Sequence, residues 1–374
     1  MLPFTGPSAG FGANAELAVL LATEQINAAG GVLGKQISLV EGDEFAKPDQ
    51  GFTAEGRVLA VPDLLGVIGP QDTHLIDSIA PQVKDLGVVT LLPGLSSQPQ
   101  LSATSPQWFQ LSPSPSILGC ALGQRLFDDG LHQVGIVYSD DRFASEFAMA
   151  AADRYKVLSR EDAVLYPTAG LSSDDVLKLV RTQGTSKLAL ALSAAEAAKL
   201  VGGARSLQLG VDRWYFGPQV SNDSFLSNVV PSWVEGMVGV TDSLPTDSAD
   251  FAAHFTSRWT DVPLTNSYFY YDAMAILALA IESASAAVGG TPSAADVRSH
   301  LASVAKPPGE VITWRTLAHG LELVRQGMDV NYQGASGSLD FSDDGGLPAG
   351  ASLIRFWKVS NAEIVPELFG SCLR

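Results

Sequence analysis

The chain has 374 residues, of which 46% are hydrophobic and 17% are charged, and its formal net charge is −17. The length favours two domains and the composition is that of a globular protein with a large buried core, whereas the negative charge disfavours binding to nucleic acids and to anionic membrane surfaces. The longest apolar run, Ala273–Ile281, is shorter than the roughly 20 residues that cross a bilayer, so no membrane span is expected.

The first residues, MLPFTGPSAG, contain no basic segment followed by an apolar core, so no signal peptide is visible. Pro3–Gly6 has the pattern of the end of a β-strand whose beginning is missing from the sequence. We therefore expect that a signal sequence is absent from this chain, and its absence is only weak evidence for a cytoplasmic location.

Residues 11–28 place Ala and aliphatic side chains along one side at helical spacing, which predicts a helix. Gly30 and Gly31 follow it and are interpreted as its left-handed C-terminal cap. Residues 37–40 then predict a strand that ends at residues 42–43. The motif GGVLGK is not interpreted as a phosphate-binding loop, because such a loop follows a strand and opens a helix, whereas these glycines follow a helix.

Beyond residue 60, predicted strands and helices alternate. The strands are predicted at residues 64–68, 88–92, 133–138, 187–192 and 213–216. This alternation predicts parallel, doubly wound α/β sheets, in which ligands bind outside the carboxyl ends of the strands. Those ends are rich in Gly, Ser, Thr, Gln and Asp, which suit hydrogen bonds to a small polar ligand. The same Ser, Thr and Asp residues are equally suited to cap the helices that follow.

Several segments, taken together and in this order, resemble the type I periplasmic solute-binding proteins, the family that includes the leucine/isoleucine/valine-binding protein of ABC transporters. They are PFTGPSAGFG (3–12), INAAGGVLGKQISLVEGDE (26–44), VIGPQDT (67–73), LLPGLSS (91–97), SDDRFASEF (139–147), VEGMVGVTD (234–242), YYDAMAILALAIESA (270–284) and VNYQGASGSLDFSDDGG (330–346). The resemblance implies two lobes, each a doubly wound, mostly parallel sheet flanked by helices. Lobe 1 would comprise residues 1–117 and 242–333, and lobe 2 residues 118–241 and 334–374. Three hinge crossings would join them, and the lobes would close over a ligand in the cleft.

The resemblance also implies ligand contacts. Thr73 matches a hydroxyl that holds the ligand carboxylate, and Gly94 and Ser96 match an amide and a second hydroxyl, with Ser97 as the alternative because this loop is one residue longer. The remaining matches are Phe11 in the side-chain pocket, Phe143 and Ser193 where amino-acid binders carry aromatic residues, Gln219 where they carry an acid for the ligand ammonium, and Asn266 and Tyr268 on the lobe 1 wall of the pocket.

Two of these matches depart from the amino-acid binders. Gln219 is neutral and gives up a charge-assisted hydrogen bond to an ammonium group, worth roughly 1.5–3 kcal/mol. Phe143 stands where those binders have a tyrosine and has no hydroxyl to donate. The ligand is therefore expected to be either an amino acid, including a branched-chain one, or a small carboxylate without an α-amine, such as an aromatic acid.

An enzyme is not expected, because the sequence has no GxSxG nucleophile motif and no GxGxxG dinucleotide motif. The acidic pairs Asp140-Asp141 and Asp343-Asp344 are interpreted as turn and cap residues. The five histidines are scattered and neither HExxH nor CxxC occurs, so no metal and no other cofactor is expected. Cys120 and Cys372 form either one disulfide or two buried free thiols.

The function implied by the resemblance is that of an extracytoplasmic, periplasmic solute-binding protein, with a lipid anchor left open. It would bind a small molecule as a monomer and deliver it to the permease subunits of an ABC importer. A ligand-sensing receptor of the same fold, signalling to a partner protein, is the alternative, and an α/β enzyme is a remote one.

Overall fold

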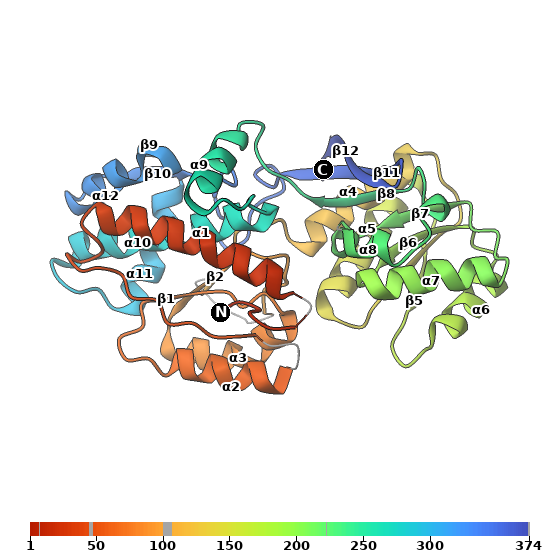
Figure 1. Ribbon diagram of the computed structural model, residues 1–374, viewed down its shortest axis with the longest axis horizontal. Coiled ribbons are helices and arrows are strands. Elements are labelled where there is room, and N and C mark those ends of the chain that lie inside the picture. The colour runs from red at the N-terminus through yellow and green to blue at the C-terminus, as the bar shows by residue number, and fades with distance from the viewer. Residues whose placement is uncertain (7, 45–47, 100–106, 222, 373–374) are drawn as a thin grey trace. The chain divides into compact units, whose positions relative to one another are not determined.

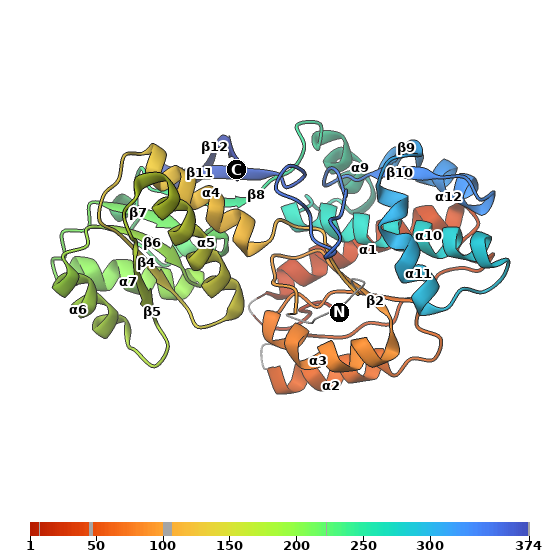
Figure 2. The ribbon, with the colours of Figure 1, turned by 180° about the vertical axis from the view of Figure 1, so that it is seen from behind.

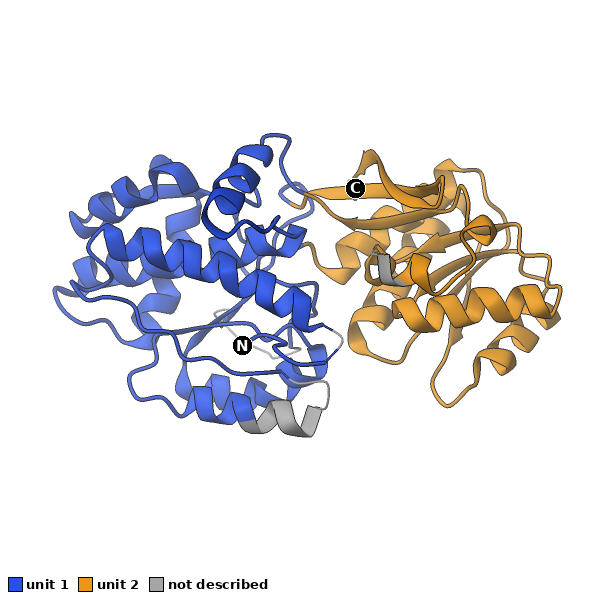
Figure 3. Cartoon of the chain, in the orientation of Figure 1, with its two compact units in different colours: residues 1–112, 244–351 blue, residues 113–243, 352–374 orange. Residues whose placement is uncertain are grey.

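The computed structural model describes residues 1–6, 8–44, 48–99, 107–221 and 223–372. The chain folds into two compact units, shown in different colours in Figure 3. Unit 1 comprises Met1–Ser112 and Leu244–Ala351, and unit 2 comprises Pro113–Ser243 and Ser352–Arg374. The chain thus passes from one unit to the other at residues 112/113, 243/244 and 351/352.

The last crossing lies later in the chain than expected, because residues 334–351 pack with unit 1. The side chains of Leu339 and Phe341 are buried in the same cluster as Phe109, and the ring centroids of Phe109 and Phe341 are 5.2 Å apart. The backbone N–H of Gln110 also donates to the carbonyl of Gly345 at 2.9 Å. The prediction that residues 334–351 belong to the second lobe is therefore wrong, because these residues pack with unit 1.

Unit 1 is built around a parallel sheet of order β1-β2-β3, with a separate parallel pair of β10 and β9 (Figure 1). Its strands are β1 (Gly66–Ile68), β2 (Val89–Leu92), β3 (Trp108–Gln110), β9 (Glu310–Thr313) and β10 (Val330–Gln333). Its helices are α1 (Ala9–Ala28), α2 (Pro48–Leu59), α3 (Thr73–Leu86), α9 (Ala249–Trp259), α10 (Thr265–Val288), α11 (Ala294–Leu301) and α12 (Leu317–Arg325), with short 3-10 turns at Ser303–Ala305 and Trp314–Thr316.

The side chains of β2 alternate between two cores. Val89 and Leu91 point into a cluster formed with α1 and α10, whereas Leu92 belongs to a second cluster that contains residues of α3. The sheet is therefore covered by helices on both faces, as expected for a doubly wound α/β unit.

Helix α10 is the central helix of unit 1. It contacts α1, α11 and α12, which lie around it in Figures 1 and 2. By length and composition alone it is long and apolar enough to cross a membrane, but 72% of its most apolar window is buried inside the structure. Its apolar character is explained by this packing, because a helix that is hydrophobic on all sides is buried on all sides.

The helix predicted over residues 11–28 is confirmed as α1, and Gly30 and Gly31 follow it with φ angles of +101° and +77°. A Cβ atom on Gly31 would lie 1.9 Å from the carbonyl oxygen of Lys35, so no larger residue fits there. The strand predicted over residues 37–40 is wrong: residues 36–42 belong to no sheet. An isolated bridge between Leu2 and Asp43 is the nearest β pairing.

Unit 2 contains a seven-stranded sheet of order β12-β11-β8-β7-β6-β4-β5, in which β4 to β8 are parallel and β11 and β12 are antiparallel additions. The strands are β4 (Val134–Tyr138), β5 (Val164–Pro167), β6 (Lys187–Ala191), β7 (Arg213–Phe216), β8 (Val238–Asp242), β11 (Ile354–Ser360) and β12 (Glu363–Gly370). The helices are α4 (Pro115–Asp128), α5 (Arg142–Ser159), α6 (Ser173–Gln183), α7 (Ala194–Ser206) and α8 (Asp223–Ser227), with 3-10 turns at Pro218–Val220 and Pro231–Trp233.

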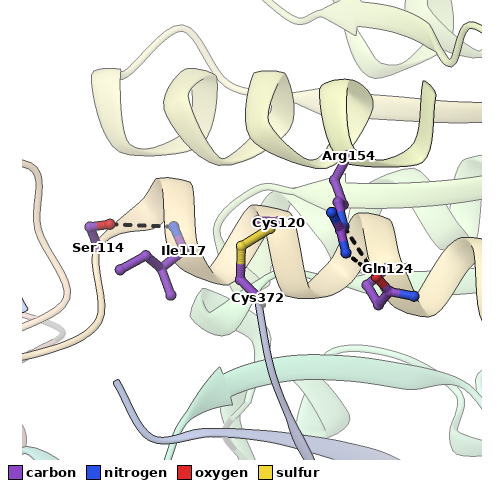
Figure 4. Close-up of a disulfide and its surroundings, with 6 residues drawn as sticks. All are labelled: Ser114, Ile117, Cys120, Gln124, Arg154 and Cys372. Atoms are coloured by element: carbon purple, nitrogen blue, oxygen red, sulfur yellow. Dashed lines mark hydrogen bonds between the residues drawn. A yellow bond between two sulfur atoms is a disulfide. The ribbon is translucent and has the colours of Figure 1, made fainter. Parts of the chain in front are cut away.

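Helix α4 carries the covalent link of unit 2 (Figure 4). Cys120 of α4 forms a disulfide with Cys372, with Cα atoms 5.5 Å apart, which resolves the two alternatives left open by the sequence. One turn further on, Gln124 accepts two hydrogen bonds from Arg154 of α5. The two helices approach closely at Gly119 and Gly123, where a Cβ atom would lie 2.1 Å and 2.3 Å from carbonyl oxygens of α5.

Candidate ligand-binding site

In unit 1, the turns that follow β1 and β2 lie side by side, because the two strands are parallel neighbours. Thr73 is the first residue of α3, and its Oγ1 accepts a hydrogen bond from the backbone N–H of Ser97 at 3.4 Å. Among the described residues, no group accepts the proton of the Thr73 hydroxyl, so the hydroxyl is able to donate to a ligand. The sequence-predicted residues Thr73 and Ser97 are thus brought together, through the backbone N–H of Ser97.

The loop after β2 is held from within unit 1. The carbonyl of Gly94 accepts from the hydroxyl of Ser112 at 2.7 Å, and a Cβ atom on Gly94 would lie 2.7 Å from Cγ of Gln71. The hydroxyl of Ser96 is fully buried and directed at the carbonyl of Gly94, 3.4 Å away. The side chain of Gln71 thus lies close to Gly94, and Ser96, like Ser97, is fully buried.

Asp72 caps α3. Its carboxylate accepts from the backbone N–H groups of His74 and Leu75 at 2.8 Å and 3.1 Å. Without this cap, the same two amides would be free to bind an anion at the N-terminus of the helix. A ligand carboxylate at this position would therefore depend on the Thr73 hydroxyl and on the loop after β2 more than on the first turn of α3.

Glu44, to which the sequence assigned no role, fixes the turn in front of Thr73. Its side chain is only 3% exposed, and its two carboxylate oxygens accept from the consecutive backbone N–H groups of Gln71 and Asp72, each at 3.0 Å. Burial raises the pKa of Glu44 to about 7. The two hydrogen bonds lower this pKa, but their effect is smaller than that of burial. In the sequence, Glu44 follows the strand-like stretch 37–43. Nothing in that pattern distinguishes it from an ordinary surface acid.

The first turns of α1 and α10 meet near this turn. The ring of Phe11 packs against Tyr270 with centroids 6.5 Å apart, and Tyr270 is fully buried, with its pKa raised by burial and by the charge of Glu44. Asn266 is 8% exposed, and its Nδ2 has no hydrogen-bond partner among the residues described. Tyr268, by contrast, donates to the carbonyl of Ser248 at 3.1 Å and packs on Phe251, which is the arrangement of a core tyrosine.

In unit 2, the sheet order brings three predicted residues to one edge. Gln219, Ser193 and Phe143 follow β7, β6 and β4, which are consecutive neighbours in the sheet. Ser193 is the N-cap of α7 and forms a capping box with Glu196, so its hydroxyl has a structural use. Phe143, in the first turn of α5, is 5% exposed. Asp141 caps the same helix, as the sequence predicted.

A polar hollow of about 300 Å³ lies in unit 2 at the carboxyl ends of β5, β4 and β6. Asp140, Thr168 and Leu192 mark the three strand ends in its lining, and Lys199 adds a positive charge. Ligands of doubly wound sheets bind at this kind of edge. Thr168 and Lys199 were missed by sequence reasoning, because neither lies in a segment that resembles the family.

Three buried carboxyl groups of unit 1 predict the pH dependence of stability. Burial is the first cause in each case, and it raises the pKa of Glu44 to about 7, of Glu55 to about 8 and of Asp272 to about 6. Between pH 4 and 8 the folded chain then binds more protons than the unfolded chain, so the free energy of unfolding falls as pH rises through this range. We expect the melting temperature at pH 5 to exceed that at pH 8.5, because these carboxyl groups must ionise inside the folded chain over this range.

Scanning calorimetry of two variants tests this dependence. Glu55 has no side-chain hydrogen bond among the described residues, and Glu55→Gln is expected to flatten the pH dependence. Asp175→Asn is the matched control, because the hydrogen bond from Ser172 and the neighbouring Lys178 lower the pKa of the exposed Asp175 to about 2, outside the window. A melting temperature that is constant or rises from pH 5 to 8.5 would contradict the assignment.

The profile of a protein family described as periplasmic binding protein matches residues 1–321. The chain belongs to this family. Its members bind solutes outside the cytoplasm and are not enzymes, so this periplasmic binding protein is extracytoplasmic and non-catalytic. The expectation from the resembling segments is therefore confirmed at the level of the family.

Solved structures share the fold of this periplasmic binding protein over nearly its whole length. The leucine-binding protein LivK of Thermotoga maritima has a TM-score of 0.77 at 16% identity, with 99% of this chain and 97% of that chain covered. A solute-binding protein of R. palustris in complex with benzoate has a TM-score of 0.69 at 13% identity, with 99% and 94% covered. The predicted type I α/β fold is thereby confirmed.

Proteins matched by sequence share low identity with this chain or match only part of it. The chemotactic signal transduction system substrate-binding protein BasB of Halobacterium salinarum is 23% identical over 364 residues, which cover 91% of this chain and 82% of that protein. An amino acid binding protein of Pseudomonas aeruginosa is 30% identical over 100 residues, or 27% of this chain and 26% of that protein. For the latter, the matched part spans only about a quarter of the relative's length.

Proposed function

We propose that this protein captures a small carboxylate, either an amino acid or a related acid without an α-amine, and delivers it to the permease subunits of an ABC importer. The ligand carboxylate is anchored by unit 1, through Thr73 and the loop 94–97. Residues of unit 2, among them Gln219 and Phe143, then close over the ligand by movement at the chain crossings. The observation that carries this proposal is the pairing of Thr73 Oγ1 with Ser97 N at adjacent strand ends.

Relatives support both candidate classes of ligand, amino acids and acids without an α-amine. The LivK structure is that of a leucine-binding protein, and the R. palustris protein was solved with benzoate. A neutral Gln219 beside β7 supports an acid without an ammonium group. Refolding the protein from denaturant, which removes ligand carried from the host, and screening amino acids and small carboxylates by thermal shift tests the proposal. Stabilisation by sugars or polyamines and by no carboxylate would reject it.

Thr73→Ala is expected to weaken carboxylate binding by about 1–3 kcal/mol, because a ligand oxygen that is buried on binding loses its donor. Isothermal titration calorimetry measures the change, and Thr73→Ser is the matched control because it keeps the hydroxyl. Equal affinities of the alanine variant and the natural protein would show that Thr73 does not contact the ligand.

Gln219→Glu is expected to shift preference toward α-amino acids and away from their deaminated analogues, because a carboxylate at this position attracts an ammonium and repels an anion. The ratio of the two dissociation constants is the quantity to measure. If both ligand types respond equally, Gln219 does not contact the ligand amine position.

A sensing receptor is the second candidate, and the likeness to the chemotactic protein BasB over 91% of this chain supports it. The binding site would be the same, but the closed form would be read by a signalling partner. Permease and ATPase genes beside the gene for this protein would support import, and a kinase or regulator gene there would support sensing.

A further inference from the structure

Glu44 carries a buried carboxyl group directly beside the proposed anchor of the ligand. Its side chain is 3% exposed, and its two oxygens hold the backbone N–H groups of Gln71 and Asp72, each at 3.0 Å. Thr73, the proposed donor to the ligand carboxylate, is the next residue of the chain. A buried acid therefore lies beside the place where a negatively charged group of the ligand is expected to dock.

Docking of a ligand carboxylate would bring three acidic groups onto five consecutive residues, 71–75. Glu44 occupies the amides of residues 71 and 72, and the side chain of Asp72 occupies the amides of residues 74 and 75. The ligand carboxylate would take the hydroxyl of residue 73, between the two. Like charges at such separations disfavour each other's ionised forms, so the group whose charge water stabilises least takes up a proton most readily.

Glu44 is that group. The side chain of Asp72 is exposed, so water stabilises its charge, whereas the carboxyl group of Glu44 is buried. The ligand itself is a free acid before it docks, and such acids are fully ionised at neutral pH. Burial raises the pKa of Glu44 to about 7, so a further negative charge beside it changes its protonation within the physiological range.

The groups that face Glu44 from the neighbouring elements do not neutralise its charge fully. Helix α2 contributes Glu55, the start of α3 contributes Asp72 and α10 contributes Tyr270, none of which is a cation. Among the described residues, the amino group of Met1 is the cation that acts on Glu44, and it favours the ionised carboxylate. Burial outweighs this attraction, so the carboxyl group remains able to accept a proton near neutral pH.

We propose that Glu44 is a positioning residue that couples ligand capture to proton uptake: as a ligand carboxylate docks on Thr73, a proton from solvent binds to a carboxylate oxygen of Glu44. This inference rests on the proposed function, because it requires a ligand carboxylate at Thr73. The protonated side chain keeps its carbonyl oxygen as an acceptor for the turn, so the turn stays held while the charge beside the ligand is removed. Since the proton is already bound at lower pH, ligand affinity rises as pH falls.

Isothermal titration calorimetry in buffers of different ionisation enthalpy counts the protons that binding takes up. The ligand is the tightest-binding carboxylate of the screen described above, with leucine and benzoate among the compounds screened. At pH 7.5 the natural protein is expected to take up about 0.3–0.7 proton per ligand bound. Its affinity at pH 6.5 is expected to exceed that at pH 8.5 about three- to tenfold.

Three variants assign the proton. Glu44→Gln nearly keeps the shape of the side chain and removes its titration, so both the uptake and the pH dependence of affinity are expected to disappear. Glu55→Gln removes another buried acid that acts on Glu44, and His74→Gln removes an exposed imidazole next to Thr73. Both are matched controls and are expected to retain the uptake. A merely structural role of Glu44 would weaken binding in Glu44→Gln and leave the number of protons unchanged.

Binding of a carboxylate by the natural protein without proton uptake would overturn the inference and leave the proposed function intact. Uptake that persists in Glu44→Gln, or that is lost in Glu55→Gln or His74→Gln, would also overturn it, because another group would then carry the proton. If no carboxylate binds, the proposed function and this inference are both rejected. Should Glu44→Gln not fold, the uptake by the natural protein and by the two controls decides the outcome.

Discussion

Removal of the disulfide is expected to lower the free energy of unfolding of unit 2 by about 3–5 kcal/mol, the range for a long closed loop. Cys120 and Cys372 are 252 residues apart in sequence, and the intervening chain includes the second segment of unit 1. The bond ties the end of the last unit 2 segment to the first helix of that unit. Without it, the unfolded chain gains the freedom that this loop closure removes.

Thermal unfolding of Cys120→Ala/Cys372→Ala, in the absence of reductant, measures this effect. Adding dithiothreitol to the natural protein is expected to give the same loss, and dithiothreitol is expected to leave the double variant unchanged. Identical melting curves for the oxidised protein and the double variant would show that the bond is absent or energetically neutral. Because disulfides persist in oxidising compartments, a bond formed in the purified native protein also supports the extracytoplasmic location.

Asp272→Ala is expected to lower the free energy of unfolding of unit 1 by about 3–5 kcal/mol. The carboxylate lies in α10, is fully buried, and accepts from Tyr332 Oη at 2.7 Å and from the N–H groups of Ala335 and Ser336 at 2.8 Å and 2.7 Å. The hydroxyl of Ser336 adds a bond at 2.6 Å. The substitution leaves all four donors without their acceptor in the interior.

Tyr332→Phe is the matched control, because it removes one of the four hydrogen bonds and leaves the carboxylate otherwise paired. We expect it to cost about 1 kcal/mol. Gly334→Ala provides an independent probe, since its Cβ would lie 2.3 Å from Oδ2 of Asp272 and would push the turn away. If Asp272→Ala is no more destabilising than Tyr332→Phe in chemical denaturation, the network does not anchor residues 334–337.

The alternation of strands and helices was read correctly from sequence, because each strand and each helix carries its own periodicity and its own cap. Asp72, Asp141 and Ser193 cap the helices that they precede. The strand over residues 37–40 failed for the opposite reason: a strand exists only where a partner pairs with it, and residues 36–42 belong to no sheet.

Features that depend on contacts between distant segments of the chain could not be predicted from the sequence. The last chain crossing was placed early, because the packing of Phe341 on Phe109 joins segments with no shared pattern. In the site, the resemblance supplied Thr73 and, as the alternative to Ser96, Ser97, and the backbone N–H of Ser97 donates to Thr73. Glu44 was missed because its role, holding the N–H groups of Gln71 and Asp72, lies in a turn distant in sequence.

We propose that the ligand is held by its carboxylate on unit 1. Isothermal titration calorimetry of the refolded protein, with the best carboxylate from the screen and with its uncharged methyl ester, tests this most directly. We expect one ligand bound per chain and an affinity for the ester that is weaker by at least about 2 kcal/mol, or roughly thirtyfold. An ester that binds as tightly as the acid would contradict it.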